Sequence, residues 1–256
     1  MNDELEARRR LAEFPLYLTP PHPCSYLEDR QATTLFIDPR FPLQMADYAQ
    51  LAELGFRRSG SYVYRPECGD CHWCIPVRVP VARFRPNRSQ RRCLRANADL
   101  AITETAAVFS EEHFRLYRRY MSARHAGGGM DKDDPEAYLS LISAPWCDSR
   151  LLEFRLQGRL LAVAAVDRFP RGLSAVYTFF EPEQARRSLG VFAVLTGIRR
   201  VREAGQEYLY PGFWNPRSPR MAYKSGFRPL EYFGAQGWRP LEDEESINPY
   251  KTITNR

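Results

Sequence analysis

The stretch that decides the fold reads Leu151-Leu-Glu-Phe-Arg-Leu156, then the turn Gln157-Gly158, then the apolar run Leu160 to Val166. Two apolar runs separated by a short turn containing glycine predict a β-hairpin. The chain continues with Ala175-Val-Tyr-Thr-Phe-Phe180, whose β-branched and aromatic residues predict another strand. The local sequence therefore predicts a sheet in this part of the chain.

Helical patterns flank these strands. Apolar residues recur at helical spacing from Ser188 to Ala204, and Ser110 and Asp134 are expected to cap two further helices. One helix is predicted in the first 100 residues, from Pro42 to Leu54, with Gly55 as its stop. Further expected elements are strands at Ser61–Tyr64, Tyr208–Tyr210 and Pro229–Phe233, and a short helix at Ser218–Lys224.

The order of these elements predicts an α/β (α+β) fold in which a mixed sheet is covered by helices. The acyltransferase superfamily, whose best-known members are N-acetyltransferases, has this order. Residues 1–100 hold five of the six cysteines and few long periodic segments, whereas the later sequence is regular. We therefore expect an N-terminal cysteine-bearing domain at 1–100 and an acyltransferase-like domain at 101–256 that ends in an acidic tail from Glu242.

Composition narrows the class of protein. With 44% apolar and 27% charged residues, 256 residues suffice for one large or two modest packed domains, and wholesale disorder is excluded. The longest apolar run, Leu160 to Val166, is too short to cross a bilayer, which needs about 20 such residues. The first ten residues contain no hydrophobic secretory core, so we expect a cytoplasmic protein without a membrane partner. The sequence does not define the oligomeric state, and a monomer is favoured.

The excess of positive charge is local. The chain has 37 lysines and arginines against 31 acidic residues, and no acid lies between Asp70 and Asp99. A one-sided positive field favours a polyanionic partner, with nucleic acid the leading candidate, although a solvated arginine-rich loop is the alternative. The residues expected to contact a nucleic acid backbone are Arg83, Arg85, Arg88, Arg91, Arg92 and Arg95.

The cysteines suggest a metal or redox site. Cys68, Cys71 and Cys74 follow one another at two-residue gaps, and Cys24 lies 44 positions before Cys68. Thiolates bind zinc or iron–sulfur clusters, so the four cysteines are candidate ligands of either, and zinc would also accept three of them with His72 or His22. A group of reduced thiols in a tight turn is the alternative. Cys93 and Cys147 are expected to be ordinary thiols.

Several segments together resemble one family, in the order in which that family has them. They are Pro23–Thr34, Gly55–Gly60, Tyr64–Arg78, Phe84–Arg92, Arg124–Met130, Ser188–Gly190, Tyr210–Trp214 and Ser218–Lys224. These segments resemble the bacterial aminoacyl-tRNA–protein transferases of the N-degron pathway. The similarity is to their aspartate/glutamate leucyltransferase branch, which is related to the eukaryotic arginyltransferases.

The resemblance implies an enzyme that transfers leucine from its tRNA to the α-amine of proteins beginning with Asp or Glu, marking them for degradation. It implies aminoacyl-tRNA as donor substrate and such proteins as partners. Eukaryotic relatives are held to carry a cluster on their N-terminal cysteines, whose spacing differs from that of Cys68–Cys74. Arginine instead of leucine as the transferred residue stays open.

The chemistry of such a transfer sets what the site must contain. An aminoacyl-tRNA is an activated ester, so its attack by an amine needs no covalent enzyme intermediate, and no clear Ser–His–Asp arrangement can be read in the sequence. Alignment of the reactants and stabilisation of the oxyanion remain. The candidate catalytic residues are Tyr210, Trp214, Tyr223, Lys224 and Tyr177, with core packing as the alternative for each aromatic.

An acidic N-terminal residue needs a cation, and arginine offers a two-pronged donor to a carboxylate. Arg30 is the first candidate for binding the acceptor and Arg78 the second, unless either pairs with an acid of the fold.

Two other classes of protein stay as competitors. A coenzyme-A-dependent N-acetyltransferase would bind pyrophosphate at the turn Arg187-Ser-Leu-Gly190, but Phe192 stands where a second small residue is needed. A non-catalytic cysteine-cluster RNA-binding or redox-sensing module would explain Cys68–Cys74 and the arginines, but not Tyr210–Lys224.

Overall fold

The structure is a computed structural model that describes residues 11–124 and 134–242. It forms two compact units, one made of Met1–Phe84 with Tyr210–Arg256 and the other of Arg85–Leu209. A division into consecutive domains at residue 100 stays a prediction. The glycines of the segment Arg124–Met130 and the acidic tail after Glu242 lie outside the described residues.

The unit Arg85–Leu209 is built on four strands in the order β11-β10-β9-β8, with each neighbouring pair antiparallel. The predicted hairpin is confirmed: β9 and β10 pair around Gln157 and Gly158, which both adopt positive φ of 49° and 85°. Such a turn matches the twist of the paired strands, and glycine adopts it without steric cost. The bounds are β8 (Ala101–Ala106), β9 (Ser149–Leu156), β10 (Arg159–Phe169) and β11 (Gly172–Phe180).

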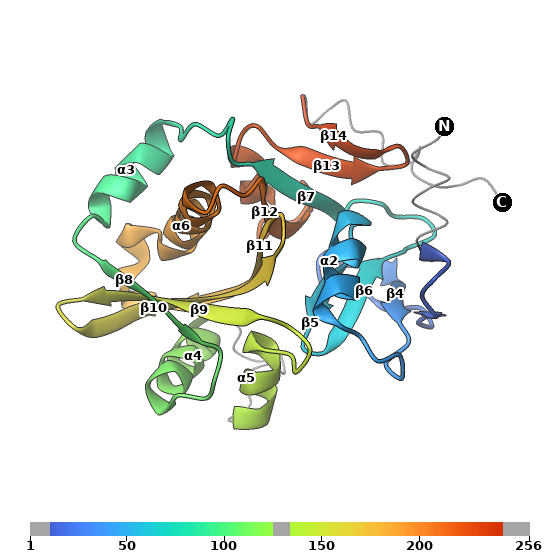
Figure 1. Ribbon diagram of the computed structural model, residues 1–256, viewed down its shortest axis with the longest axis horizontal. Coiled ribbons are helices and arrows are strands. Elements are labelled where there is room, and N and C mark those ends of the chain that lie inside the picture. Colours follow the sequence, from blue (N-terminus) through green and yellow to red (C-terminus); the bar gives the residue numbers. More distant parts are fainter. Residues whose placement is uncertain (1–10, 125–133, 243–256) are drawn as a thin grey trace. The chain divides into compact units, whose positions relative to one another are not determined.

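Helices cover both faces of these strands (Figure 1). On one side, α4 and α5 pack on the strands through an apolar cluster that includes Phe114, Tyr138, Leu151 and Phe179. On the other side lie α3 and α6, and Phe154 of β9 meets Phe192 of α6 edge-on at 5.5 Å. The helices are α3 (Arg88–Ala96), α4 (Glu111–Arg124), α5 (Pro135–Ile142) and α6 (Leu189–Glu203), with a 3-10 helix η1 (Pro182–Arg187) before α6.

The second unit contains shorter elements. A four-stranded sheet has the order β1-β4-β6-β5, a separate pair joins β2 to β3, and β14, β13, β7 and β12 are successive neighbours in strand order. The bounds are β1 (Leu16–Leu18), β2 (His22–Pro23), β3 (Gln31–Ala32), β4 (Thr34–Ile37), α2 (Met45–Glu53), β5 (Arg57–Ser59), β6 (Tyr62–Pro66), β7 (Ile75–Pro80), β12 (Tyr208–Trp214), η2 (Ala222–Gly226), β13 (Glu231–Gly234) and β14 (Gly237–Pro240).

The α/β class expected from the sequence is confirmed, and so are its long helices. The helix expected at 42–54 is α2, which buries Tyr48, Leu51 and Ala52. The short helix expected at 218–224 is wrong in detail, because the regular part is only the 3-10 helix η2 and Ser218 lies in the turns before it. In the part of the chain that the structure describes, no helix has both the length and the apolar character needed to span a membrane.

Candidate functional site

Lys224 is held against the backbone of β12. Its ammonium donates a hydrogen bond of 2.6 Å to the carbonyl oxygen of Phe213. The preceding residue, Gly212, has φ of +90°, and a Cβ placed there would lie 3.5 Å from the lysine Nζ. Because a side chain at this φ is strained, only glycine lets the strand pass the lysine head in this conformation. The hydrogen bond from Lys224 to β12 thus explains why the segment Tyr210–Trp214 and the lysine at position 224 are needed together.

The surroundings of Lys224 favour its neutral form. Burial lowers its pKa to about 8, with a smaller contribution in the same direction from the charge of Arg57 and a still smaller opposing effect of Cys74. The guanidinium of Arg57 is itself buried and donates to the carbonyl oxygens of Ala52, Phe56 and Val77 at 3.2, 2.5 and 3.3 Å. The half-buried Lys224 and the buried Arg57 therefore lie near each other, and this positive region would stabilise negative charge that develops nearby.

Tyr210 is part of the core rather than of an open surface. Its side chain is 1% exposed, and its hydroxyl donates a short hydrogen bond to Glu53 Oε1. Burial and the Glu53 carboxylate raise the tyrosine pKa far above its usual value. The Arg57 guanidinium lies 5.1 Å from the centre of the Tyr210 ring. This residue anchors β12 to α2 in the present arrangement.

Arg78 forms the structural pairing that the sequence left open as the alternative to acceptor binding. Its Nη1 donates to Glu53 Oε2 and its Nε to Glu231 Oε2, both at 2.8 Å, and its side chain is only 8% exposed. Arg83 donates to the other oxygen of Glu231 at 2.9 Å. The Arg78 guanidinium also lies 4.4 Å from the centre of the Trp238 ring. These carboxylates already accept the hydrogen bonds that Arg78 would have to donate to an acceptor's carboxylate.

The other two aromatic candidates differ in exposure. Trp214 is fully buried, and its indole N–H has no hydrogen-bond partner among the described residues. Tyr223, in η2, is 47% exposed and meets Phe227 edge-on. Of the candidates Tyr210, Trp214 and Tyr223, Tyr223 is thus the one that a substrate can reach. The N–H of Ser218 donates to the Asn215 carbonyl, so it is not available to a substrate.

Two predicted site residues make no contact with this group among the interactions of the described residues. Arg30 is exposed, in the connection between β2 and β3, and its side chain pairs with none of the described residues. Tyr177, in β11 of the other unit, donates a hydrogen bond of 3.4 Å to the sulfur of Met121. Burial raises the pKa of Tyr177 well above its usual value. Their predicted roles stay predictions.

The arginine run adopts more order than the sequence analysis expected. All six of its arginines are exposed, and four of them lie on α3 at positions 88, 91, 92 and 95. These positions share one helix face, while Gln90 and Cys93 are buried on the opposite side. Asn87 accepts from the Gln90 N–H, and the Gln90 side chain accepts from the Asn87 N–H. This capping box was the readable signal for the helix.

The four predicted cysteine ligands come together. Cys24, Cys68 and Cys71 each influence the pKa of Cys74, which burial chiefly raises to about 12. All four are half-buried free thiols, and the Asn215 amide donates to the Cys74 sulfur at 3.8 Å. Over the described residues, no group of three or more His, Cys, Asp or Glu is arranged so that it could hold a metal ion. The four thiols are chemically suitable ligands for zinc or an iron–sulfur cluster. They are not arranged as a complete coordination shell in this structure.

Sequence reasoning missed the residues that surround Lys224 and Arg78. Glu53 ends α2, Glu231 begins β13, and Arg57 begins β5. Arg57 stands in Gly55–Gly60, one of the segments that carried the resemblance, and this was the only signal for it. Nothing in the local pattern could connect Glu53 and Glu231 to Arg78, because the pairing depends on the tertiary fold.

Comparison with known protein families identifies the class. Residues 22–92 match the family model described as arginine-tRNA-protein transferase, N terminus, and residues 112–234 match the corresponding C-terminus model. Together these models span most of the chain, including the four candidate cysteine ligands, the arginine run as far as Arg92, and Lys224. The protein is thus an aminoacyltransferase that uses an aminoacyl-tRNA as donor.

Individual relatives place the chain within that class. It is 50% identical over 233 residues to a protein from Pseudomonas putida (strain W619) named aspartate/glutamate leucyltransferase, covering 90% of this chain and 98% of the relative. A protein of the same name from Nitrosococcus oceani is 49% identical over 231 residues, covering 90% and 97%. The chain belongs to the aminoacyl-tRNA–protein transferase family.

Two solved structures are similar at a lower level. One is the C-terminal domain of a putative lysylphosphatidylglycerol synthetase from Agrobacterium fabrum, with a TM-score of 0.46, 16% identity, and coverage of 75% of this chain and 61% of that one. The other is L-PGS from Bacillus licheniformis, with a TM-score of 0.40, 12% identity, and coverage of 82% and 76%. At these scores neither likeness supports a conclusion about this chain.

The lowered pKa of Lys224 predicts a distinctive dependence of stability on pH. Between pH 8 and 10.5 the unfolded chain still binds the lysine proton while the folded protein has lost it. The free energy of unfolding of the native protein should therefore rise relative to that of Lys224→Met across this window, by about 3 kcal/mol at most. Below pH 8 the full cost of the buried charge is present in the native protein. Denaturant unfolding of both proteins at several pH values measures this difference, and a difference that stays constant from pH 7.5 to 10.5 would contradict the burial of the ammonium.

Proposed function

We propose that this protein transfers leucine from leucyl-tRNA to the N-terminal α-amine of proteins that begin with Asp or Glu, marking them for degradation in the cytoplasm. The observation that carries this proposal is the 50% identity to a protein named aspartate/glutamate leucyltransferase over 98% of that protein's length. The proposed donor and acceptor are supported because the similarity extends over nearly the whole chain of the relative and not over an isolated domain.

The reaction needs little covalent chemistry from the protein. The lone pair of the acceptor amine forms a bond to the ester carbonyl carbon, the bond from that carbon to the ribose oxygen breaks, and the amine proton goes to the released tRNA hydroxyl. Orientation of two bound reactants can supply about 7–11 kcal/mol of the barrier, and one donor to the oxyanion about 3–4 kcal/mol. The residues therefore act chiefly by alignment and by stabilising charge.

Lys224 is the residue best placed for the oxyanion. One of its N–H groups is bound to the Phe213 carbonyl, and an ammonium has two more to donate. The nearby charge of Arg57 adds to the positive field. Exposed Tyr223 is proposed to contact substrate, whereas buried Tyr210 and Trp214 are proposed to position β12. Tyr177 remains a candidate on the other unit.

Arg30 is the better candidate for binding the acidic acceptor residue. Arg78 is buried and has both prongs on Glu53 and Glu231, whereas the Arg30 side chain is exposed. The bidentate geometry of a guanidinium suits the carboxylate of either Asp or Glu. We therefore assign acceptor recognition to Arg30, and a structural role to Arg78.

Backbone contacts with tRNA are proposed for the exposed arginines of the run. Arg83 and Arg85 precede α3, and the four arginines of α3 share its outward face. Guanidinium groups on one helix face suit a row of phosphates, and such contacts weaken with salt.

The cysteines are proposed to bind zinc or an iron–sulfur cluster that shapes the loop next to β12. Cys74 accepts a hydrogen bond from Asn215, the residue directly after β12. When bound, such a group would cross-link Cys24 to Cys68–Cys74 and so fix this loop. Iron and zinc analysis of the purified protein, with Cys74→Ser as the comparison, tests this.

The proposed reaction can be tested directly with purified protein. Peptides beginning with Asp, Glu or Ala are incubated with leucyl-tRNA or with arginyl-tRNA, and the products are measured by mass spectrometry. We expect one leucine added to the Asp and Glu peptides and none to the Ala peptide. Addition of arginine alone would show that the donor is arginyl-tRNA, and no product with either donor would contradict the proposed function.

A variant of Lys224 separates its role from the function of the whole protein. Lys224→Met keeps the length of the side chain and removes the donor, so kcat should fall by about 10²–10³-fold while tRNA affinity is retained. Steady-state transfer rates at saturating leucyl-tRNA measure this. An unchanged kcat would remove Lys224 from the reaction, although the enzyme would remain a leucyltransferase.

The assignment of Arg30 predicts a change in acceptor choice. Arg30→Glu places a carboxylate where the acidic acceptor residue would bind, so transfer to Asp and Glu peptides should fall by at least tenfold, as expected for a lost charge-assisted pair. Arg40→Glu serves as the matched control, because Arg40 is also exposed in the same unit and is bonded to the nearby Asp38. Rates of transfer to the peptides decide this, and equal rates in both variants would exclude Arg30 from the acceptor site.

A further inference from the structure

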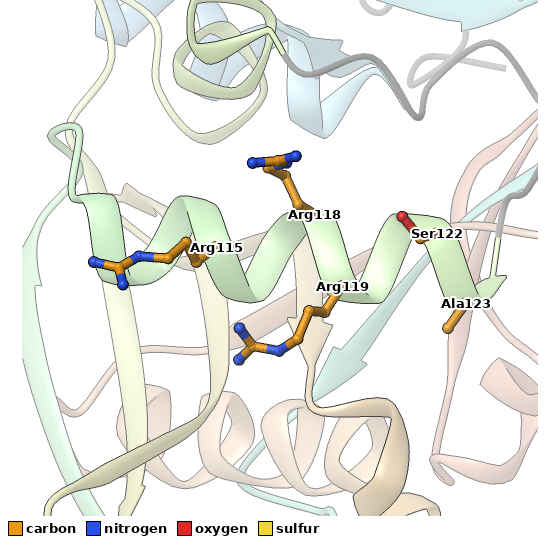
Figure 2. A pocket seen from close by; sticks show the side chains of 5 residues that line it. All are labelled: Arg115, Arg118, Arg119, Ser122 and Ala123. Carbon is orange, nitrogen blue, oxygen red and sulfur yellow. The ribbon is translucent and has the colours of Figure 1, made fainter.

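A basic hollow lies on the outward side of α4. It is a shallow cavity of about 580 Å³ lined by Arg115, Arg118, Arg119, Ser122 and Ala123. Figure 2 shows the three arginine side chains extending from α4, with Ser122 and Ala123 further along the same helix. The three arginines lie at i, i+3 and i+4, so their side chains start from neighbouring positions on the helix surface.

The fold does not need these arginines for its core. The opposite face of α4 buries Phe114, Leu116, Tyr117 and Met121, which pack on the strands of this unit. The arginines are on the solvent side, where Arg115 is 63% and Arg119 is 52% exposed. Packing of the apolar face of a helix requires only that the outward positions be polar, whichever polar residue stands there. Three closely spaced arginines therefore concentrate more charge than packing requires.

The carboxylates near this face bind the arginines only in part. Arg119 donates to Glu181 at 2.9 Å, and Arg115 pairs with Glu111 at 3.3 Å one turn away. Glu181 is shared, because Arg159 also lies 3.6 Å from it. Ion pairs of such exposed arginines are weak, and each guanidinium has five N–H donors. Phosphate oxygens can therefore be bound without breaking the packing beneath.

We propose that the α4 face, defined by Arg115, Arg118 and Arg119, is a second binding surface for the phosphate backbone of tRNA. The inference rests on the proposed function, which requires tRNA as donor, and it adds a surface that the arginine run does not include. In Figure 1, α3 and α4 lie on opposite sides of strands β8 to β11. The α4 face must therefore contact a different part of the RNA from that bound by the α3 arginines.

The chemistry of this face favours RNA over other anions. A guanidinium fits phosphate with two parallel hydrogen bonds, and three of them in a row fit several neighbouring phosphates. The N-terminus of the acceptor protein carries an α-amine that is largely cationic at neutral pH, so three arginines would repel it. A membrane surface would require large apolar side chains next to the cations, whereas this hollow offers only Ser122 and Ala123.

The test compares two pairs of substitutions in the full-length protein. R115Q/R118Q removes two cations of the α4 face and leaves the Arg119–Glu181 pair intact. R199Q/R202Q is the matched control, because both arginines are exposed on α6 of the same unit and Arg199 also pairs one turn away, with Glu203. Affinity for deacylated tRNA is measured at several salt concentrations, so the result does not depend on transfer.

We expect the slope of log K against log salt to become shallower by about 2 in R115Q/R118Q, since each lost phosphate contact removes about 0.9. In the control the slope should stay as in the native protein. The KM for leucyl-tRNA should rise in R115Q/R118Q while kcat at saturating tRNA is retained.

Specific outcomes would overturn this inference. An unchanged slope in R115Q/R118Q, or an equal loss in the control, would show that the face does not bind RNA. Loss of binding to phosphatidylserine vesicles with an unchanged tRNA slope would assign the face to a membrane surface instead. Failure of the proposed function looks different, because the native protein would then bind tRNA and yet give no leucyl product.

Discussion

The buried ion pairs of Arg78 with Glu53 and Glu231 hold together the part of the protein that carries Lys224. They join α2, β7 and β13, and the Tyr210 hydroxyl binds the remaining oxygen of Glu53, which adds β12. Removing one partner of a buried ion pair leaves an uncompensated charge and typically costs about 3–5 kcal/mol. The geometry of β12 and of the lysine bound to it depends on this network remaining complete.

The same network explains why Lys224 has an unusual environment. Glu53 and Glu231 are used by Arg78, Arg83 and Tyr210, and no carboxylate pairs with Lys224 among the described residues. Its hydrogen bond goes to a backbone carbonyl, and the nearby buried charge is that of Arg57. A cation without a counter-charge is costly in the free protein, and that cost is relieved when negative charge forms beside it. An oxyanion in a transition state is such a charge.

The sequence predicted those features that depend on neighbouring residues. The hairpin at Gln157-Gly158, the helix begun by Asp134-Pro135 and the long helix from residue 188 follow from turn, cap and spacing rules, and all three are present. The strands of two to four residues near the N-terminus were not predicted, because such short runs carry no period. The Asn87–Gln90 capping box was readable, but the dense arginines obscured the helix that follows it.

The candidate site was less predictable, for a physical reason. Arg78 and Glu231 are separated by 153 positions, and no local pattern reports a pairing at that distance. Tyr210 and Trp214 were candidates for catalysis because of their motif, yet both are buried, as the alternative of core packing allowed. A motif records that residue types are needed together and does not say whether they contact substrate or support the residue that does.

Charge on the helices illustrates the reverse case, in which sequence spacing carries real functional information. On α3 and on α4, buried residues alternate with arginines so that each helix has one buried face and one basic face. The buried faces are explained by packing, but packing alone would accept glutamate, glutamine or serine on the outside. Repeated arginine on both outward faces therefore needs another cause, and a partner with many phosphates is the one that the family provides. Because these faces lie on opposite sides of one set of strands (Figure 1), a partner that binds both, as proposed, must extend around that unit, which a folded tRNA can do and a short acidic peptide cannot.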